Sequence, residues 1–132
     1  MLGLAALTVW RAARNEAQAR IDTPPLGEII EVDGHDVHAL VKGSGTDLVL
    51  IHGSSGNIRD FTHSLVDQLT DRYRVIVLDR PGLGYSEAVN PKGDTIFEQA
   101  AILQKAAAQL GAEKPIVVGQ SYGGTVALAW AV

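Results

Sequence analysis

The sequence predicts an α/β fold, a three-layer α/β/α sandwich built on a mostly parallel sheet. Three continuous apolar runs, LVLI (48–51), VIVL (75–78) and IVVG (116–119), have the length and branched side chains of strands buried on both faces. Segments with helical periodicity separate these runs. Strands that alternate with helices in this way form a parallel sheet with helices on both of its faces.

A β-hairpin is predicted before these strands. EIIEV (28–32) and DVHALVK (36–42) are rich in β-branched residues and flank Asp33-Gly34. Asp-Gly between two such runs is a strong hairpin signal, because both residues tolerate the positive φ angles of a tight turn. The sheet is therefore expected to begin with an antiparallel pair.

Three helices are predicted in the remaining chain. The first covers about 58–73, where apolar residues recur three and four positions apart. The second opens with a capping box at Thr95-Ile96-Phe97-Glu98, runs to Leu110 and stops at Gly111. The third begins near Gly123 and reaches Val132 without a stop signal. We therefore expect the sequence to end inside a helix of a longer protein, rather than at the end of a complete small domain.

Composition limits the possible functions. A chain of 132 residues has room for one compact domain of ordinary size, and its net charge of −4 argues against a nucleic-acid partner. The absence of cysteine excludes disulfides, thiolate metal sites and a cysteine nucleophile. No dinucleotide-binding loop or P-loop pattern occurs, so no NAD, ATP or other cofactor is predicted.

Residues 1–25 form a separate N-terminal segment and linker, and residues 26–132 form the α/β domain. The segment starts with the apolar run LGLAALTVW (2–10), which continues into RAARNEAQAR (11–20) and ends at Pro24-Pro25. Nine apolar residues are too few to cross a bilayer, which takes about 20. Two interpretations stay open: part of a membrane anchor, or a short amphipathic helix docked on the domain. Localisation, cytoplasmic or membrane-associated, and oligomeric state are left undetermined.

The motif GQSYGG (119–124) carries the main functional prediction. Gly119-Gln120-Ser121-Tyr122-Gly123 matches G-x-S-x-G where a buried strand ends and an apolar helix begins, the placement of a nucleophile elbow. In such a turn the serine is held in a strained conformation and its hydroxyl projects above the strand. Ser121 is the predicted nucleophile. The backbone N–H of Tyr122, at the helix start, is a predicted oxyanion donor.

A second oxyanion donor is predicted in HGSSGN (52–57), which follows another buried strand. The backbone N–H of Ser54 can complete an oxyanion hole with that of Tyr122. His52 at the strand exit is interpreted as a structural, hydrogen-bonding histidine rather than as the general base. No metal site is predicted, because His35 and His38 point to opposite faces of their strand. His63 is expected on the solvent side of its helix, and Asp79, before Pro81 and two glycines, is expected to form a turn.

Three motifs in this order, HGSSGN (52–57), DRPGLGYS (79–86) and GQSYGG (119–124), resemble the α/β-hydrolase fold superfamily. The resemblance is greatest to its esterase, haloperoxidase-like and proline-iminopeptidase-like branch, and it covers the N-terminal half of a family domain. It implies a serine nucleophile at Ser121, with oxyanion N–H groups from Ser54 and Tyr122. Members with aspartate at the elbow are dehalogenases or epoxide hydrolases, so Ser121 favours ester, thioester or amide substrates.

The sequence departs from the family pattern after the elbow. Family members place an acid and then a histidine after the nucleophile, and residues 122–132 contain neither. Both are expected beyond residue 132, so little or no activity is expected of these 132 residues alone. Two alternatives remain open: a non-catalytic binding or scaffold protein on the same fold, and an acyltransferase that forms the same acyl-enzyme.

Overall fold

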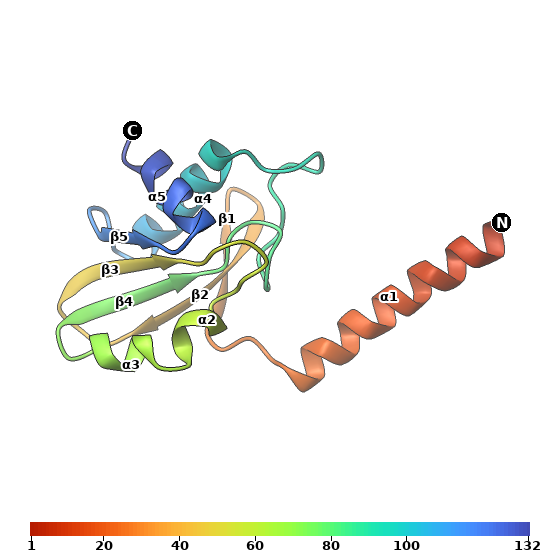
Figure 1. The fold of residues 1–132 in the computed structure, drawn as a ribbon, viewed down its shortest axis with the longest axis horizontal. Coiled ribbons are helices and arrows are strands. Elements are labelled where there is room, and N and C mark those ends of the chain that lie inside the picture. Colours follow the sequence, from red (N-terminus) through yellow and green to blue (C-terminus); the bar gives the residue numbers. More distant parts are fainter.

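The computed structural model describes residues 1–132, and its centre is one mixed five-stranded sheet (Figure 1). The strand order is β1-β2-β4-β3-β5. The three apolar runs form β3, β4 and β5, which pair in parallel, and the hairpin adds β1 and β2 as antiparallel strands. The bounds are Glu28–Val32 for β1, His35–Lys42 for β2, Thr46–Ile51 for β3, Tyr73–Leu78 for β4 and Ile116–Gly119 for β5.

The predicted hairpin turn is confirmed. Asp33 and Gly34 adopt φ angles of 51° and 80°, as two-residue hairpin turns with the right twist require. Val32 pairs with His35 directly across this turn. The turn thereby sets the register of β2, which in turn pairs Ala39 with Leu78 of β4.

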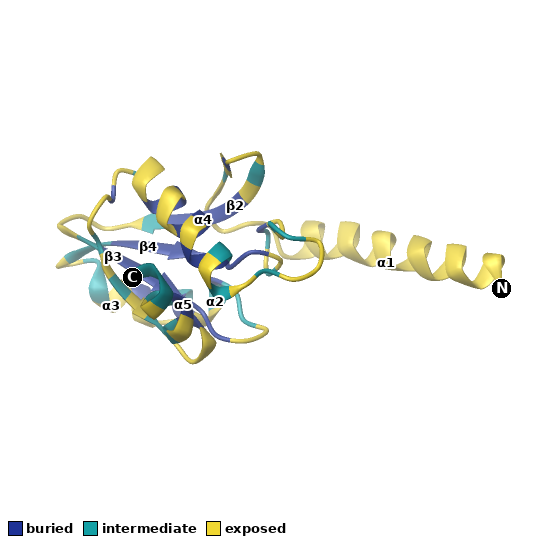
Figure 2. Ribbon diagram, turned by 90° about the horizontal axis from the view of Figure 1, so that it is seen from above, coloured by how far each residue is buried: buried dark blue, intermediate teal, exposed yellow.

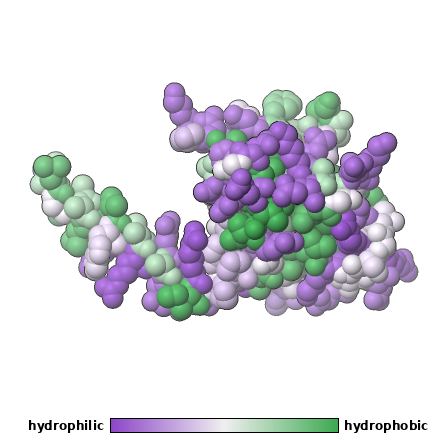
Figure 3. Space-filling model, turned by 180° about the vertical axis from the view of Figure 1, so that it is seen from behind, coloured by the Kyte–Doolittle hydropathy of each residue, from purple (hydrophilic) through white to green (hydrophobic).

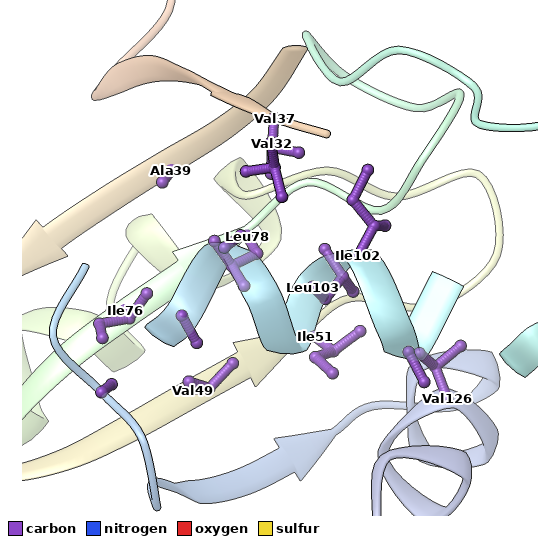
Figure 4. Close-up of a cluster of buried hydrophobic side chains, with 14 residues drawn as sticks. Val32, Val37, Ala39, Val49, Ile51, Ile76, Leu78, Ile102, Leu103 and Val126 are labelled. Atoms are coloured by element: carbon purple, nitrogen blue, oxygen red, sulfur yellow. The ribbon is translucent and has the colours of Figure 1, made fainter. Parts of the chain in front are cut away.

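Helices cover both faces of the sheet, which confirms the three-layer architecture. On one face, α4 (Ile96–Gln109) and α5 (Tyr122–Trp130) pack on a core of 14 buried residues, drawn in Figure 4. On the other face, α2 (Arg59–Thr62) and α3 (Leu65–Leu69) enclose a second core of eight buried residues. Helix α4 begins at the predicted capping box, in which Thr95 and Glu98 exchange hydrogen bonds, and it ends before Gly111 at φ 90°.

The prediction of one helix over 58–73 is wrong. Ser64 leaves the helical region at φ −152° and separates α2 from α3. The burial of Phe61 and Val66 explains the break, because a continuous helix would turn residues five apart by about 140° around its axis. With the break, both side chains reach the same core beneath the sheet.

The expectation that IVVG (116–119) is buried on both faces is also wrong. Strand β5 is the edge of the sheet. Ile116 and Val118 lie on the same face as α2 and α3 but are exposed, because these helices do not extend over the edge strand. Val117, on the opposite face, packs against the core under α4 and α5. Leu128 of α5 is exposed as well, so an apolar surface lies beside the end of this strand.

The N-terminal segment forms one helix, α1 (Leu2–Asp22), which projects away from the domain (Figures 1 and 2). None of its residues is buried, so the interpretation of an amphipathic helix docked on the domain is wrong for its apolar part. Only its last turn meets the domain, where Arg20 lies 5.5 Å from the ring centroid of Tyr85. The helix is not long and apolar enough to cross a membrane, and neither is any other helix of the structure.

Candidate active site at the carboxyl edge of the sheet

Ser121 occupies a strained turn between β5 and α5. Its backbone angles are φ 55° and ψ −122°, a combination that residues other than glycine rarely adopt. The side chain is exposed and its hydroxyl makes no hydrogen bond, either to the helix it precedes or to another residue. The serine thus lies at the carboxyl end of a parallel strand with its hydroxyl free to meet a ligand.

Two glycines allow this turn to pack tightly. A Cβ atom on Gly119 would overlap the backbone of Gly123, the second residue of α5. A Cβ atom on Gly123 would overlap the carbonyl oxygens of Ile51 and His52 at the end of the neighbouring strand. Helix α5 can therefore start directly against β3 only because both positions lack a side chain.

The loop HGSSGN (52–57) lies directly beside the elbow. The N–H of Gln120 donates to the carbonyl oxygen of Ile51 at 3.0 Å, and the N–H of Gly53 donates to Oε1 of Gln120 at 3.1 Å. A Cβ atom on Gly53 would lie 3.1 Å from that of Ser121. Gly53, which precedes Ser54, therefore contacts Ser121, the predicted nucleophile. Tyr122 follows Ser121 as the first residue of α5.

Arg80 joins the two loops, and sequence reasoning missed it. Arg80 is only 4% exposed. Its Nε donates to the carbonyl oxygen of His52 at 2.9 Å, and its Nη2 donates to the carbonyl oxygen of Gly53 at 2.7 Å. Its Nη1 donates to Oε1 of Gln99 at 2.8 Å. The guanidinium also lies 4.7 Å from the ring centroid of Tyr122. Burial lowers the pKa of Arg80, an effect that Tyr122 partly opposes. The only sequence signal was its place inside DRPGLGYS.

His52 is structural, as its position at the strand exit predicts. It is completely buried; Nδ1 donates to the carbonyl oxygen of Gly53 at 3.0 Å, and Nε2 accepts from the N–H of Arg80 at 2.9 Å. Burial is the largest cause of a lowered pKa, so the neutral ring is favoured. With both ring nitrogens engaged by the backbone, His52 cannot act as a base toward Ser121.

Asp79 does more than form the predicted turn. It accepts from the N–H of Tyr85 at 3.0 Å, as a turn residue would, but also from the N–H of Ile58 at 2.8 Å. Its Oδ2 lies 2.7 Å from Nδ1 of His38, and both side chains are buried. Nε2 of His38 accepts from the N–H of Gly27 at 3.3 Å. The pairing of β2 with β4 creates this buried pair, which no spacing in the sequence indicates.

The other histidines lie apart from the elbow. His35 is half-buried at the start of β2, on the opposite face of that strand from His38, and His63 is exposed after α2, as predicted. Neither makes a hydrogen bond to Ser121. The structure therefore brings together the elbow, the HGSSGN loop and Arg80, but no base or acid for the serine.

Comparison with known proteins agrees with this arrangement. The family model described as α/β hydrolase fold matches residues 47–132. The chain is 38% identical, over 80% of its length, to the dihydrolipoyllysine-residue acetyltransferase component of an acetoin cleaving system from Cupriavidus necator. It is 34% identical, over 70% of its length, to a proline iminopeptidase from Saccharolobus solfataricus. Among solved structures, epoxide hydrolase A from Mycobacterium thermoresistibile superposes with a TM-score of 0.71 over 80% of this chain at 24% identity.

The fold and the site define an α/β protein with a strained serine turn between β5 and α5, and the chain belongs to the α/β-hydrolase fold family. Its relatives also include a haloalkane dehalogenase from Mycobacterium tuberculosis and a soluble epoxide hydrolase from Corynebacterium. The chain spans only about a third of the length of the proteins it matches. The matched part is 28% of the Cupriavidus protein, 30% of the iminopeptidase and 34% of epoxide hydrolase A.

Proposed function

We propose that the protein is a serine hydrolase that cleaves ester, thioester or amide bonds through an acyl-enzyme on Ser121. The observation that carries this proposal is the backbone of Ser121, held at φ 55° and ψ −122° with an exposed, unbonded hydroxyl. Such strain persists only where the surroundings impose it, and here two glycines and a neighbouring strand do so. A serine in an ordinary surface turn has no need of this geometry.

In the proposed reaction the hydroxyl oxygen of Ser121 attacks the acyl carbonyl carbon. The serine proton passes to a histidine base, and the carbonyl oxygen becomes an oxyanion that the N–H groups of Ser54 and Tyr122 stabilise. The N-terminus of α5 adds its partial positive charge at this point. The leaving group departs with the proton from the histidine, and water then releases the acid from the serine by the reverse sequence.

The base and its acid are proposed to lie outside these 132 residues. His52 and His38 have both ring nitrogens engaged by other groups, and neither His35 nor His63 bonds to the serine. A serine hydroxyl without its base is a weak nucleophile, and the loss of a triad member lowers the rate by several powers of ten. We therefore expect residues 1–132 alone to turn over a simple aryl ester no faster than their Ser121→Ala variant.

The substrate class follows from the chemistry of a hydroxyl nucleophile. Relatives of this chain include a haloalkane dehalogenase and an epoxide hydrolase, whose substrates react at an alkyl carbon. Attack by Ser121 on such a carbon would form an ether, which water does not cleave under mild conditions. Attack on an acyl carbon forms an ester, which water can cleave. Acyl substrates are therefore the ones that Ser121 can turn over.

Labelling with a fluorophosphonate tests the proposal. The full-length protein is expected to be labelled, and Ser121→Ala is expected to lose the label. Ser54→Ala is the matched control: it removes a neighbouring hydroxyl but keeps the backbone N–H on which the proposed oxyanion hole depends, so labelling should persist. A folded full-length protein that is not labelled would refute the hydrolase and favour a non-catalytic binding protein on the same fold.

An acyltransferase is the second candidate, because the relative with 38% identity is an acetyltransferase component by name. The same acyl-enzyme would then pass its acyl group to an alcohol, thiol or amine instead of water. Once labelling has established the nucleophile, the two functions are separated by product analysis with an aryl ester and an added acceptor. Acylated acceptor formed in proportion to its concentration identifies the transferase, and free acid alone identifies the hydrolase.

A further inference from the structure

The outer half of α1 is apolar and has no partner in the structure. Residues 2–10 form its first turns, contact nothing in the domain and contain no charged side chain. Figure 3 shows mostly apolar side chains toward the outer end of this helix and a mixture of polar and apolar ones nearer the domain. The large exposed apolar residues within 2–10 are Leu2, Leu4, Leu7, Val9 and Trp10.

These side chains cover about 220° of the helix circumference, and Ala5 and Thr8 occupy the rest. At about 100° per residue, Leu2 and Val9 lie on one side, Leu4 on the opposite side, and Leu7 and Trp10 between them. A groove on a protein buries one side of a helix, which selects a stripe. A segment with large apolar side chains over more than half of its circumference fits surroundings that enclose it, as acyl chains do.

Polar groups mark where such an environment would end. Arg11 and Arg14 follow the apolar segment directly, and the Arg14 guanidinium lies 5.3 Å from the ring centroid of Trp10. Tryptophan next to arginine is typical of the boundary between acyl chains and headgroups, where arginine meets phosphate. Within the segment, the hydroxyl of Thr8 donates to the carbonyl oxygen of Leu4 at 2.8 Å, so it needs no partner from water.

The length of residues 2–10 sets how deep these residues can reach among the acyl chains. Nine helical residues extend about 13.5 Å, roughly half of the hydrocarbon core of a bilayer. We propose that residues 2–10 insert among the acyl chains of a membrane containing anionic phospholipid, with Trp10, Arg11 and Arg14 among the headgroups. The remaining turns of α1, down to Asp22, then form a polar stalk between the membrane and the domain.

The attachment of α1 to the domain sets which edge of the sheet faces the membrane. Tyr85 donates its hydroxyl proton to the carbonyl oxygen of Thr23, and Nη2 of Arg59 donates to that of Pro24 at 2.7 Å. Both contacts lie just beyond the carboxyl ends of β4 and β3, the edge that also carries Ser121. The stalk therefore extends from the site side of the domain (Figure 1). Membrane attachment itself does not depend on the proposed hydrolase activity.

Vesicle flotation with the full chain tests the insertion. The protein is expected to float with phosphatidylcholine vesicles, and Leu4→Asp/Leu7→Asp is expected to lower binding at least about tenfold, because aspartate is costly among acyl chains. Asn15→Asp/Gln18→Asp is the matched control, with the same charge change and spacing in the polar half of α1. It should bind as the original chain does. Since α1 buries nothing, neither variant should alter the circular dichroism of the domain.

A second pair of measurements tests the headgroup contact and the depth. Adding phosphatidylglycerol should strengthen binding, and Arg11→Gln/Arg14→Gln should remove both that gain and its salt dependence. In Trp130→Phe, Trp10 is the one remaining tryptophan, and its emission should shift to the blue on vesicles. The proposal is overturned if Leu4→Asp/Leu7→Asp binds vesicles as well as the original chain. It is equally overturned if the chain fails to float or if Trp10 emission is unchanged on vesicles. An unchanged emission would also be the result if residues 2–10 joined two copies of the chain instead of entering the membrane.

Discussion

The backbone N–H of Gly53 donates to the side-chain oxygen of Gln120 at 3.1 Å, and this bond joins the HGSSGN loop to the turn that carries Ser121. The two residues are 67 positions apart and follow adjacent parallel strands, β3 and β5. The bond therefore holds the loop that carries Ser54 against the residue that precedes Ser121. Its role can be tested separately from the chemistry of the serine.

Replacing Gln120 with alanine is expected to lower the free energy of unfolding by about 1 kcal/mol, because the partly buried N–H of Gly53 loses its acceptor. Urea unfolding followed by circular dichroism measures the change. Gln104→Ala is the control, since that side chain is exposed on α4 and makes no hydrogen bond, and it should differ from the original chain by a few tenths of a kcal/mol at most. Equal unfolding midpoints for both variants would contradict the prediction.

Arg80 is expected to stabilise the same region more strongly. Arg80→Met keeps the aliphatic stem but removes the guanidinium bonds to the carbonyl oxygens of His52 and Gly53 and to Oε1 of Gln99, which should cost about 2 to 3 kcal/mol. Arg80→Lys should recover only part of this loss, because an ammonium group cannot reproduce the fork of the guanidinium. Arg72→Met, at an exposed site, should be nearly neutral in the same unfolding assay. A neutral Arg80→Met would show that these bonds contribute no net stability.

The pair of Asp79 and His38 is expected to be the most sensitive polar contact of the domain. Asp79→Ala leaves the ring of His38 and the N–H groups of Ile58 and Tyr85 without an acceptor in a buried place. The loss should be about 3 kcal/mol or more. Asp67→Ala removes a carboxylate of an exposed pair with Lys42 and should cost less than about 1 kcal/mol. Similar losses for the two variants would contradict this account.

Protonation of His52 is expected to lower the free energy of unfolding in mild acid. Burial lowers its pKa in the folded chain below the ordinary value of 6.5, so the unfolded chain binds more protons between the two values. The contribution of His52 is therefore complete above about pH 6.5 and is lost as the pH falls below that value. Unfolding free energies measured from pH 7.5 to pH 5 should show this decline, and His52→Gln should make it shallower.

His63→Gln is the control for that measurement, because His63 is exposed and belongs to no buried network. It should keep the pH dependence of the original chain. If the free energy of unfolding of His52→Gln falls as steeply as that of His63→Gln between pH 6.5 and pH 5, protonation of His52 is not what destabilises the chain in acid.

Local patterns in the sequence were sufficient for much of the fold. Asp33-Gly34 predicts the hairpin because its turn needs two residues that tolerate positive φ, and the Thr95 to Glu98 box predicts the start of α4 because its bonds span only three residues. The elbow at Ser121 was predictable for the same reason, since strand, serine, glycines and helix are contiguous. The roles assigned to the N–H groups of Ser54 and Tyr122 stay predictions.

Packing decided what local patterns could not. The break at Ser64 exists because Phe61 and Val66 must reach one core, and the exposure of Val118 follows from the place of β5 at the sheet edge. By itself the sequence determined the strands, the hairpin, the capped helix and the position of the turn at Ser121, because each depends on neighbours in the chain. Only the tertiary structure decided that Arg80 joins two loops and that His38 meets Asp79, because those contacts depend on which strands lie side by side.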